Sequence, residues 1–421
     1  MFPANHPAPD ADPVKPEPPL KIVLAGVGSH GDIQPLLGLG HALRGRGHEV
    51  TLAAGDNYAA VAAGAGLKFQ STGSSVQTMV EQGGEDLFKP AKFLAVLREL
   101  APEQLDRTAA AAAGADVVIG SPACFVGPSV AAIVGARYCW ATYAPGTFAT
   151  ATAPFLVFGF SARRRWVNRL SHKVSDVVLG RALMGILNPL LVARGQPAVH
   201  DLARHFSEKA TALYAVDEAF GPAPADWTLA SHQTGFWYYD DGAPFPAALE
   251  DFLNAGEPPV YVGFGSMPVR DPAARTRTIV EAAVKSGRRT LISAGWGKLG
   301  DGELPSSILR IGGVSHARLF PRCAAIVHHC GAGTTSAASR SGVPQVPVPH
   351  AYDQPQWAES LVQLGVAKTI VKHKFNADEL AAAIKAVVVD DVVKAKAQAL
   401  GEKLRVTNGT SRAAMIIEGL R

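Results

Sequence analysis

The sequence predicts an α/β protein built from two doubly wound domains. Short apolar runs alternate with helical stretches from Lys21 onward, and the same rhythm restarts near Pro258. Apolar runs without polar alternation predict strands buried on both faces, as in parallel sheets covered by helices. A chain of 421 residues also exceeds what one hydrophobic core usually organises. We therefore expect two Rossmann-like domains that face one another across a cleft.

The first domain is expected to open on a strand, a turn and a helix. An apolar run over 21–25 leads into a glycine-rich turn over 26–32, and a helical stretch follows at about 34–46. Pro35 suits the first turn of this helix, because the N–H that proline lacks is not needed there. Residues 1–20 are rich in proline and carry no signal-peptide pattern, so we expect a disordered leader.

Turn-forming residues between Asp240 and Pro258 predict the domain boundary. We expect an acceptor-binding domain over 21–245 and a nucleotide-sugar-binding domain over 246–421, for reasons given below. A helix is expected over 272–286 of the second domain. Its expected strands are the apolar runs near 258–266, 289–295, 324–330, 344–349 and 367–371.

The composition argues against several classes of protein. Hydrophobic residues make up 48% of the chain and charged residues 18%, which is typical of a globular protein. No uninterrupted apolar run is long enough to span a bilayer. A formal net charge of +4, without a basic stripe, argues against nucleic-acid binding. The four cysteines form neither a CxxC pair nor a zinc spacing. We expect a cytoplasmic protein with small-molecule partners.

The apolar run at 153–160, which arginines and Trp166 follow, allows two interpretations. One is a helix of the first domain with a basic, exposed end, because burial in the core is the usual fate of apolar residues. The other is an apolar lid or acceptor wall that could make peripheral contact with a membrane surface.

The strongest local signal lies at 324–342. A buried strand is expected to end at His329, glycines at 331 and 333 allow a tight turn, and a helix is expected from around Thr334. The N-terminus of a helix attracts anions. Together with hydroxyls and a donor from His329, it could bind a diphosphate and stabilise it as it departs. The alternative is a plain strand-to-helix connection whose glycines serve packing alone.

Carboxylates with the spacing of a divalent metal site are scarce. Asp10 and Asp12 lie in the expected leader, and Asp390 and Asp391 suit the start of a helix. We therefore predict no catalytic metal and no other cofactor. Asp353 and Gln354 are expected at the carboxyl edge of the second sheet, where a carboxylate and an amide could bind the vicinal hydroxyls of a sugar. Capping of the next helix is their alternative role.

With these elements in hand, the chain resembles the nucleotide-sugar glycosyltransferases of the GT-B fold. More narrowly, it is similar to the bacterial natural-product and sterol glucosyltransferase branch of the UDP-glycosyltransferase family. The similarity covers residues 21–421. It rests on GVGSHGDIQP (26–35), ADWTLASHQTGFWYYD (225–240), YVGFGSM (261–267), VHHCGAGTT (327–335) and GVPQVPVPHAYDQ (342–354).

The resemblance implies roles for individual residues on the donor side. His329 matches the histidine that contacts the donor diphosphate, while Asp353 and Gln354 match the pair that binds the sugar hydroxyls. Ile311 stands where the plant enzymes carry a stacking tryptophan, which leaves uridine and thymidine both open as the nucleoside. Cys330 matches the plant version of the motif. The remaining donor-site residues that the resemblance implies are Gly31, Ser266, Gly331, Gly333, Thr334 and, near the nucleobase, Val314.

The first glycine-rich turn also spells GxGxxG, with glycines at 26, 28 and 31. That motif alone would suit an NAD(P)-dependent oxidoreductase, whose usual companion is an acidic residue about twenty positions later. Asp56 is a loose match. A third hypothesis is a lipid-binding relative without catalysis. The second-domain motifs have no role in the oxidoreductase scheme, so we favour glycosyl transfer.

In the family that the chain resembles, this turn supplies the base for the acceptor hydroxyl. Asp32 takes that place, just before the expected helix, and His30 is its competitor. The usual pKa of about 6.5 for His suits base chemistry better than about 3.9 for Asp. A carboxylate can nevertheless serve when proton removal lags behind bond formation at a cationic centre, which its charge also stabilises. We favour Asp32; a purely capping role for it is the alternative.

The resemblance implies an inverting transfer of a sugar, expected to be glucose, from a UDP- or TDP-linked donor to a lipophilic hydroxyl. Sterols, polyketides and flavonoids are the acceptor classes it implies. The sequence leaves the donor sugar, the acceptor and the oligomeric state open. The apolar walls expected to contact the acceptor are Tyr143, Phe148, Phe155, Phe158 and Trp166.

Overall fold

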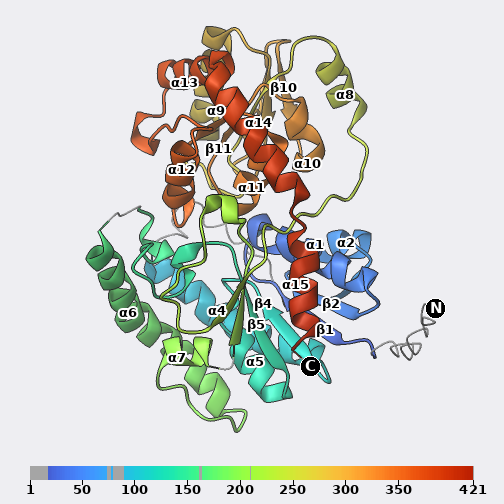
Figure 1. The fold of residues 1–421 in the computed structure, drawn as a ribbon, viewed down its shortest axis with the longest axis vertical. Helices are drawn as coiled ribbons and strands as arrows, with labels where there is room; N and C mark the ends of the chain where they lie inside the picture. The colour runs from blue at the N-terminus through green and yellow to red at the C-terminus, as the bar shows by residue number, and fades with distance from the viewer. Residues whose placement is uncertain (1–17, 74–76, 79–89, 161–163, 209, 421) are drawn as a thin grey trace, which may run out of the picture.

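The computed structural model describes residues 18–73, 77–78, 90–160, 164–208 and 210–420. Figure 1 shows two α/β units stacked along the long axis of the molecule. The expected leader lies mostly outside the described residues. Within them, two sheets form, and every strand pairing in both sheets is parallel.

The first sheet has seven strands in the order β3-β2-β1-β4-β5-β6-β7. The order reverses between β1 and β4, so the carboxyl ends of these two strands form a topological switch point, where ligands bind in open α/β sheets. The strands are β1 (Lys21–Ala25), β2 (Glu49–Ala54), β3 (Lys68–Ser71), β4 (Val117–Gly120), β5 (Arg137–Thr142), β6 (Ala210–Tyr214) and β7 (Ala230–Gln233). The helices are α1 (His30–Gly45), α2 (Ala59–Gly64), α4 (Pro90–Ala111), α5 (Gly127–Val134), α6 (Arg165–Val192) and α7 (Leu202–Ser207).

The second sheet has five strands in the order β10-β9-β8-β11-β12. Its switch point lies between β8 and β11. The strands are β8 (Val260–Gly263), β9 (Thr290–Ser293), β10 (Ile308–Ile311), β11 (Ala325–His328) and β12 (Gln345–Pro347). The helices that follow or cover them are α8 (Ala247–Asn254), α9 (Pro272–Ser286), α10 (His316–Leu319), α11 (Ala332–Ser341), α12 (Gln354–Gln363), α13 (Ala377–Val389), α14 (Asp391–Val406) and α15 (Gly409–Glu418).

Alternation along β1 distributes its side chains between two cores. Ile22 and Leu24 pack into the core beneath α1, whereas Val23 and Ala25 pack into the core on the opposite face of the sheet. Both sets are buried. This is the double burial that the unbroken apolar run predicts, and truncating a core leucine such as Leu24 to alanine typically costs about 2–5 kcal/mol of stability.

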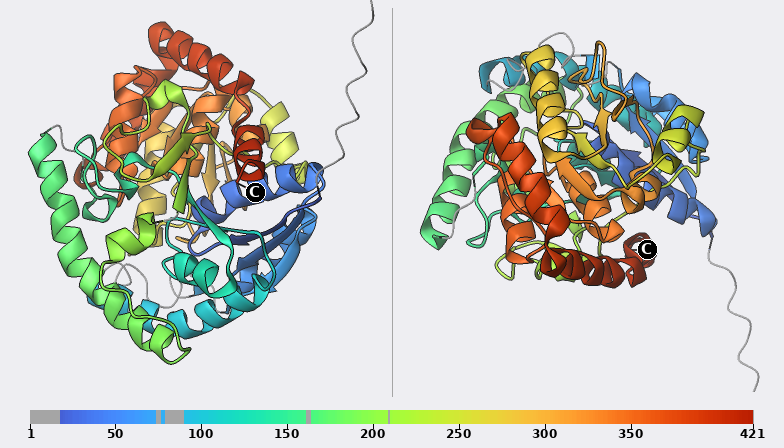
Figure 2. Two further views of the ribbon diagram at one scale, coloured as in Figure 1. Left: turned by 60° about the horizontal axis from the view of Figure 1, so that its bottom comes forward. Right: turned by 90° about the horizontal axis from the view of Figure 1, so that it is seen from above.

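The last helix returns to the first unit. Ala413, Ala414 and Ile417 of α15 belong to the core beneath α1, and Glu418 pairs with Arg46 at 2.6 Å. In both views of Figure 2 the C-terminus lies beside α1. The domain limits at 245 and 246 stay a prediction, but α15 packs with the first unit although it follows the second in sequence.

Four elements differ from the sequence expectation. Residues 367–371 form only an isolated bridge, between Ala367 and Gln345, and not the expected strand. Helix α1 begins at His30, because Ser29 caps it, so Pro35 lies inside the helix rather than in its first turn. Helix α11 begins at Ala332, two residues before the expected start. Residues 153–160 form a loop with one short 3-10 turn, not the expected helix, and α6 begins only at Arg165.

Helix α6 is long and apolar enough to cross a membrane, judged by length and composition alone. One third of its most apolar window is buried inside the protein.

Candidate active site

The N-termini of α1 and α11 face each other between the two units. A methyl group on Gly333 would lie 3.9 Å from the Cα atom of Gly31, and the two helices pack together. Each helix follows a strand at the switch point of its own sheet. The predicted donor-binding turn and the predicted catalytic turn therefore meet at one place, where the topology favours a ligand.

The first turn of α1 is closed by its own side chains. Ser29 accepts a hydrogen bond from the Gly31 amide at 3.3 Å, and the Asp32 carboxylate accepts from the Ser29 amide at 2.8 Å. This capping box satisfies backbone N–H groups that would otherwise be free. Gly28 makes room for it, since a Cβ atom there would lie 2.2 Å from the Asp32 carboxylate. The capping role foreseen as an alternative for Asp32 is therefore present, and Asp32 lies within the helix rather than before it.

The surroundings of Asp32 change its basicity. Removal from water raises the pKa of its carboxyl to about 6, against hydrogen bonds from Ser29 that lower it. The negative charge of Asp32 contributes to raised pKa values of Tyr58, Tyr143 and Tyr352. Tyr352 belongs to the second unit, so the carboxylate lies close to both sides of the cleft. A pKa near 6 brings Asp32 into the range in which general bases work.

His30 lies on the rim of the same corner. Its ring lies 5.5 Å from that of Tyr58 and 6.1 Å from that of Trp296, measured between centroids. Partial enclosure lowers its pKa below the usual value, although the residue is exposed overall. The shift makes His30 a weaker base, whereas the shift at Asp32 makes the carboxylate a stronger one. The two pKa shifts therefore make His30 and Asp32 more alike as bases.

His329 follows β11 and lies buried between two glycines. Methyl groups on Gly265 and Gly331 would lie 2.8 Å and 2.6 Å from its ring atoms. Burial, with smaller contributions from nearby histidines, lowers its pKa well below the usual value, so the imidazole is neutral near pH 7. Its Nδ1 atom is buried without a hydrogen-bond partner among the described residues. A buried, unpaired polar atom is costly unless a ligand or water completes it.

The N-terminus of α11 is left open, in contrast to that of α1. Gly331 occupies the cap position and offers no side chain. The hydroxyl of Thr335 is buried without a hydrogen-bond partner in the described part of the chain, and Thr334 is half-buried beside it. Free amide groups and the positive end of the helix dipole suit an anion. Cys330 adopts φ = 70°, a left-handed conformation that is uncommon for a residue other than glycine and that this tight turn requires.

Asp353 and Gln354 open α12 at the same edge of the sheet. Asp353 is at the cap position without a capping bond; its carboxylate instead accepts from Trp357 Nε1 at 2.7 Å. Burial raises its pKa to about 6, and the charge of Asp32 adds to the shift. The Gln354 oxygen accepts from the amides of His350 and Ala351 at 2.8 and 3.0 Å. The Gln354 side-chain oxygen thus stabilises its own loop. The amide nitrogen, which lies 3.4 Å from the Met267 sulfur, is the remaining group of Gln354 that could donate to a sugar hydroxyl.

The other donor-site residues lie in loops at the carboxyl edge of the second sheet. Ser266 follows β8 in the turn that holds Gly265, and Val314 is half-buried after β10. Sequence reasoning missed Trp296, which follows β9, donates from its backbone to Gly265 at 3.0 Å and lies against His30 across the cleft. A tryptophan between glycines directly after a strand end was the signal that could have identified it.

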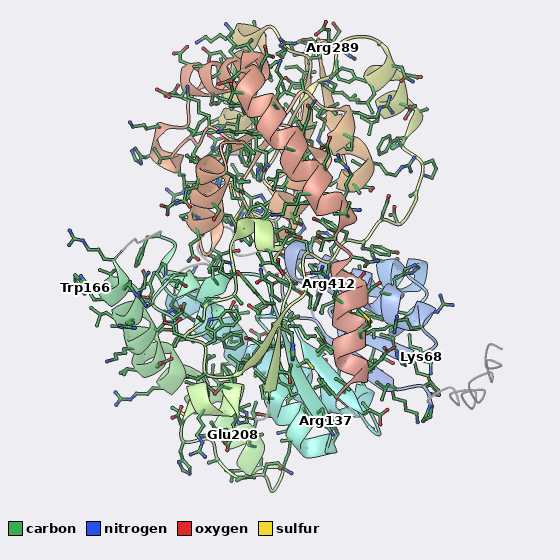
Figure 3. All side chains as sticks on the ribbon, viewed as in Figure 1. Lys68, Arg137, Trp166, Glu208, Arg289 and Arg412 are labelled. Carbon is green, nitrogen blue, oxygen red and sulfur yellow. The ribbon has the colours of Figure 1, made fainter. Side chains whose placement is uncertain are left out.

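The predicted acceptor residues separate into three environments. Tyr143 is buried in the core beneath α1 and donates to the Asp32 carbonyl at 3.2 Å, while Phe148 packs between Trp140 and Trp227. Phe155 and Phe158 stack edge to face in the loop before α6. Trp166 is 62% exposed and projects outward from α6 in Figure 3. The structure does not gather these five side chains around one cavity, and their contact with an acceptor stays a prediction.

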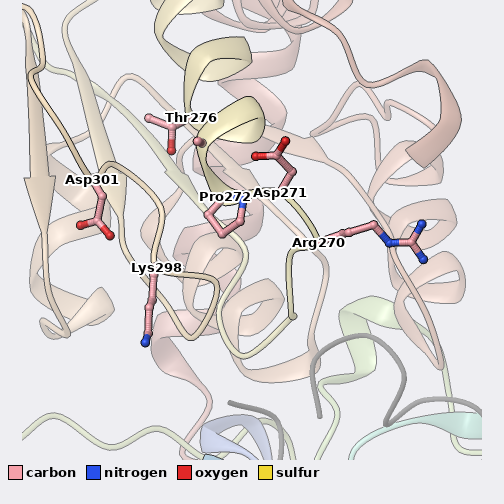
Figure 4. Close-up of a pocket in the computed structure, with 7 residues that line it drawn as sticks. Arg270, Asp271, Pro272, Thr276, Lys298 and Asp301 are labelled. Carbon is pink, nitrogen blue, oxygen red and sulfur yellow. The ribbon is translucent and has the colours of Figure 1, made fainter. Parts of the chain in front are cut away.

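A cavity of about 580 Å³ opens beside this corner, between the loops after β8 and β9 (Figure 4). Asp271 caps α9, and Asp301 pairs with Arg310 at 2.8 Å, so both carboxylates that line the cavity already have partners within the second unit. Neither His329 nor Asp32 lines this cavity. We therefore place the candidate site where the N-termini of α1 and α11 meet, and not at the cavity. Within the described residues, no group of three His, Cys, Asp or Glu side chains gathers to hold a metal ion.

Comparisons with known proteins fit this geometry. Residues 22–152 match the family described as Glycosyltransferase family 28 N-terminal domain, and residues 296–410 match the C-terminal domain described as Erythromycin biosynthesis protein CIII-like. The O-mycaminosyltylonolide 6-deoxyallosyltransferase of Streptomyces fradiae is 33% identical, over 95% of this chain and 97% of that protein. The chain belongs to the UDP-glycosyltransferase-like glycosyltransferases.

Solved structures share the fold of this chain. The glycotransferase of kitacinnamycin has a TM-score of 0.72 at 22% identity, covering 95% of this chain and 98% of its own. The glycosyltransferase VinC in complex with DTDP has a TM-score of 0.68 at 19% identity, covering 95% and 99%. The predicted GT-B class, with two Rossmann-like sheets, is confirmed.

A sterol 3-beta-glucosyltransferase of Cryptococcus neoformans var. neoformans serotype D is 32% identical over 95% of this chain. The chain spans 27% of that fungal protein's length. The oxidoreductase hypothesis receives no support from these relatives. The structure also gives the glycines of its motif a local role: a methyl group on Gly26 would lie 2.4 Å from the Ile33 side chain, and Asp56 is bonded to Ser71.

Proposed function

We propose that this protein transfers a sugar from a UDP- or TDP-linked donor to a hydroxyl group of a lipophilic acceptor, with inversion at the anomeric carbon and without a metal ion. One observation carries the proposal. The open N-terminus of α11, with the unpaired Nδ1 atom of His329 beside it, packs against the first turn of α1, which carries the Asp32 carboxylate. An anion site and a base are thus opposed over the space that a sugar would occupy.

On the donor side, the amides that open α11 bind the diphosphate. Gly331 and Gly333 let the phosphate approach the backbone, and Thr334 adds a hydroxyl. His329 donates one N–H as a neutral imidazole, because its pKa lies well below the usual value. These groups stabilise the negative charge that develops as the diphosphate leaves, a task that Mg²⁺ or Mn²⁺ performs in metal-dependent transfer.

On the acceptor side, Asp32 removes the proton. The acceptor oxygen attacks the anomeric carbon from the side opposite the diphosphate, the bond from that carbon to the diphosphate oxygen breaks, and the hydroxyl proton passes to the Asp32 carboxylate. A pKa of about 6 lets this carboxylate accept a proton more readily than an ordinary aspartate while remaining ionised at pH 7. Its charge also stabilises an oxocarbenium-like centre. One displacement turns an α-linked donor into a β-glycoside.

The relatives support the acceptor class. One acts, by name, on O-mycaminosyltylonolide and others on sterols. Both names describe hydroxyl-bearing, largely apolar molecules. We propose acceptors of the same kind here, bound on the side of the first unit, and glucose as the first sugar to test.

The test is a transfer assay with purified protein. UDP-glucose, TDP-glucose and related donors would be incubated with a small panel of sterols, macrolide aglycones and flavonoids, and the products identified by mass spectrometry and by the anomeric NMR coupling. We expect a β-glycoside in the presence of excess EDTA. An α-linked product would contradict inversion, and activity that EDTA abolishes and Mg²⁺ restores would contradict the metal-free proposal.

Nucleotide binding gives a second, independent measurement. UDP or TDP should raise the melting temperature of the protein, since a ligand that binds only the folded state stabilises it. Stabilisation by NAD(P) instead would revive the oxidoreductase hypothesis, and stabilisation by neither would favour a lipid-binding relative.

A further inference from the structure

The first half of helix α6 is polar on its buried face and carries an apolar stripe on its exposed face. The buried side chains of its first half are Asn168, Ser171, His172 and Ser175. Its exposed apolar residues recur at helical spacing on the opposite side: Trp166, Leu170, Val174, Val177 and Val178, the last of them 67% exposed. A helix on the surface of a water-surrounded protein shows the reverse pattern. The outer stripe therefore requires an explanation other than packing within the chain.

Hydrogen bonds fix this orientation. Asn168 donates to the Ala151 carbonyl at 2.9 Å, the Ser171 hydroxyl accepts from the Phe155 amide at 2.9 Å, and His172 Nε2 lies 3.1 Å from the Ala153 carbonyl. Rotation that buried the valines would break all three bonds and leave buried polar groups unpaired, which is costly. The apolar stripe is therefore held outward by the loop at 151–155.

Basic side chains lie beside the apolar stripe of α6. Five basic residues occur in the sequence 164–181 and one acidic residue, Asp176. All six are exposed. Arg164 and Arg165 stand at the start of the helix, while Arg169 and Lys173 flank the stripe along one side. An apolar stripe bordered by basic side chains, with a tryptophan at one end, matches the chemistry of a membrane surface that contains anionic lipids.

We propose that α6 docks the protein on the surface of a membrane containing anionic lipids, with Trp166, Leu170, Val174, Val177 and Val178 inserted at the headgroup level. The helix lies in the plane of the interface and does not cross it. Its polar face is bonded to its own protein, and Lys173, Asp176 and Arg181 lie within its length. In Figures 1 and 2, α6 forms the outer edge of the first unit, so no other element of the described chain blocks its approach.

Docking would bring the cleft close to the lipid surface. Val157 and Phe158, in the loop before α6, are exposed and extend the apolar surface. The same loop reaches the second unit, because Gln356 donates to the Pro154 carbonyl at 3.3 Å. The inference that a lipophilic acceptor enters the cleft from the membrane rests on the proposed function; the docking itself does not.

The experiment measures co-sedimentation of the full chain with vesicles. Vesicles of phosphatidylcholine with phosphatidylglycerol are compared with vesicles of phosphatidylcholine alone. We expect binding to the anionic vesicles that weakens as salt rises. The double variant Val174→Glu, Val178→Glu should bind at least about tenfold more weakly, because two charges replace inserted apolar groups. Lys173→Gln should weaken binding by about fivefold, the equivalent of about 1 kcal/mol for one basic residue at an anionic surface.

Val284→Glu on α9 is the matched control. Val284 is 64% exposed on the second unit, so the substitution makes one of the two Val-to-Glu changes away from α6 and should leave vesicle binding unchanged. All variants should keep the wild-type melting temperature, since each changed side chain is exposed.

Three results would overturn the proposal: no binding of the wild type to anionic vesicles, equal loss in Val284→Glu, or a dimer in light scattering that the double variant converts to a monomer. The last result would assign the stripe to a second copy of the chain. Turnover of a water-soluble acceptor should be unchanged in the α6 variants, so failure of docking and failure of the proposed function are distinguishable.

Discussion

The N-termini of α1 and α11, which meet between the two units, follow similar glycine-containing turns but are capped differently. Both α1 and α11 follow a strand at a switch point through a glycine-containing turn. Helix α1 closes its N-terminus with Ser29 and Asp32, whereas α11 has Gly331 at its cap and leaves its first amides open. The closed terminus presents a carboxylate to the cleft, and the open one presents donors. In the proposed function, the same local architecture supplies a base on one side and an anion site on the other, according to which residue occupies the cap.

Among the substitutions that test this comparison, that of Asp32 should have the largest effect on turnover. Asp32→Asn keeps an oxygen that can accept the Ser29 hydrogen bond but removes the charge, so turnover at saturating donor should fall by about 10² or more. His30→Ala is the control and should change turnover by less than about tenfold, because His30 lies on the rim. Steady-state kinetics of both variants make the measurement. A larger loss in His30→Ala would assign the base to the histidine.

The next effect concerns the open terminus. His329→Ala removes a donor from the diphosphate site, and UDP or TDP affinity should fall by about 10- to 100-fold, the range for a hydrogen bond to a charged group. Isothermal titration calorimetry would measure it. His373→Ala, an exposed histidine of the second unit, is the control and should bind nucleotide as the wild type does. Unchanged affinity in His329→Ala would remove this residue from the site.

The pH dependence of turnover would sharpen the role of the closed terminus. Asp32 acts as a base only when ionised, and its pKa is about 6. Turnover at saturating donor should therefore be level above that pH and fall by about tenfold for each unit below it. An acid limb near pH 4, the usual range for an exposed aspartate, would show that Asp32 is not the titrating group.

Substitution by alanine should have different effects at Gly331 and at Gly333, the two glycines of the open α11 terminus. Gly331→Ala places a methyl group 2.6 Å from the His329 ring, whereas Gly333→Ala meets nothing closer than 3.9 Å. We expect Gly331→Ala to displace the imidazole and lower nucleotide affinity by about tenfold, a loss comparable to one hydrogen bond. Gly333→Ala should keep the stability of the nucleotide-free protein. Equal stability and equal affinity in both variants would contradict the close packing of His329.

The smallest effect is on stability. Because the folded-state pKa of Asp32 is raised, the protonated carboxyl stabilises the fold below the unfolded-state value, and this contribution is lost as pH rises through about 6. At pH 7.5, Asp32→Asn should therefore be more stable than the wild type, by roughly 1–3 kcal/mol for a shift of about two units. The gain should shrink toward pH 5. Denaturant unfolding at the two pH values would measure it, and a pH-independent difference would contradict the raised pKa.

Much of the site followed from the sequence. The turns at 26–32 and 329–334 are visible because glycines and hydroxyl residues interrupt apolar runs at strand ends. Their meeting across the cleft could not be read from spacing, since it depends on how two separately folded sheets pack. Trp296 was missed for the same reason: its contact with His30 joins residues of two units. The sequence predicts the start of helix α1 four residues too late, because Pro35 suits a first helical turn, whereas the Ser29 cap decides the boundary.

The acceptor side shows the other limit. Aromatic residues at 143–166 looked alike in the sequence, yet Tyr143 is buried in the core and Trp166 is exposed. Composition does not distinguish these fates, because each depends on neighbours that arrive from distant parts of the chain.

The sequence by itself determined the class of fold, the alternation of strands and helices in its regular parts, and the glycine-rich turns at two strand ends. Local backbone preferences and the burial period act over a few residues and can be read directly. Tertiary structure alone decided that the pKa of Asp32 is raised, that His329 is neutral, and that α6 turns its valines outward. Each of these depends on removal from water or on hydrogen bonds to partners far along the chain, and only the folded arrangement sets them.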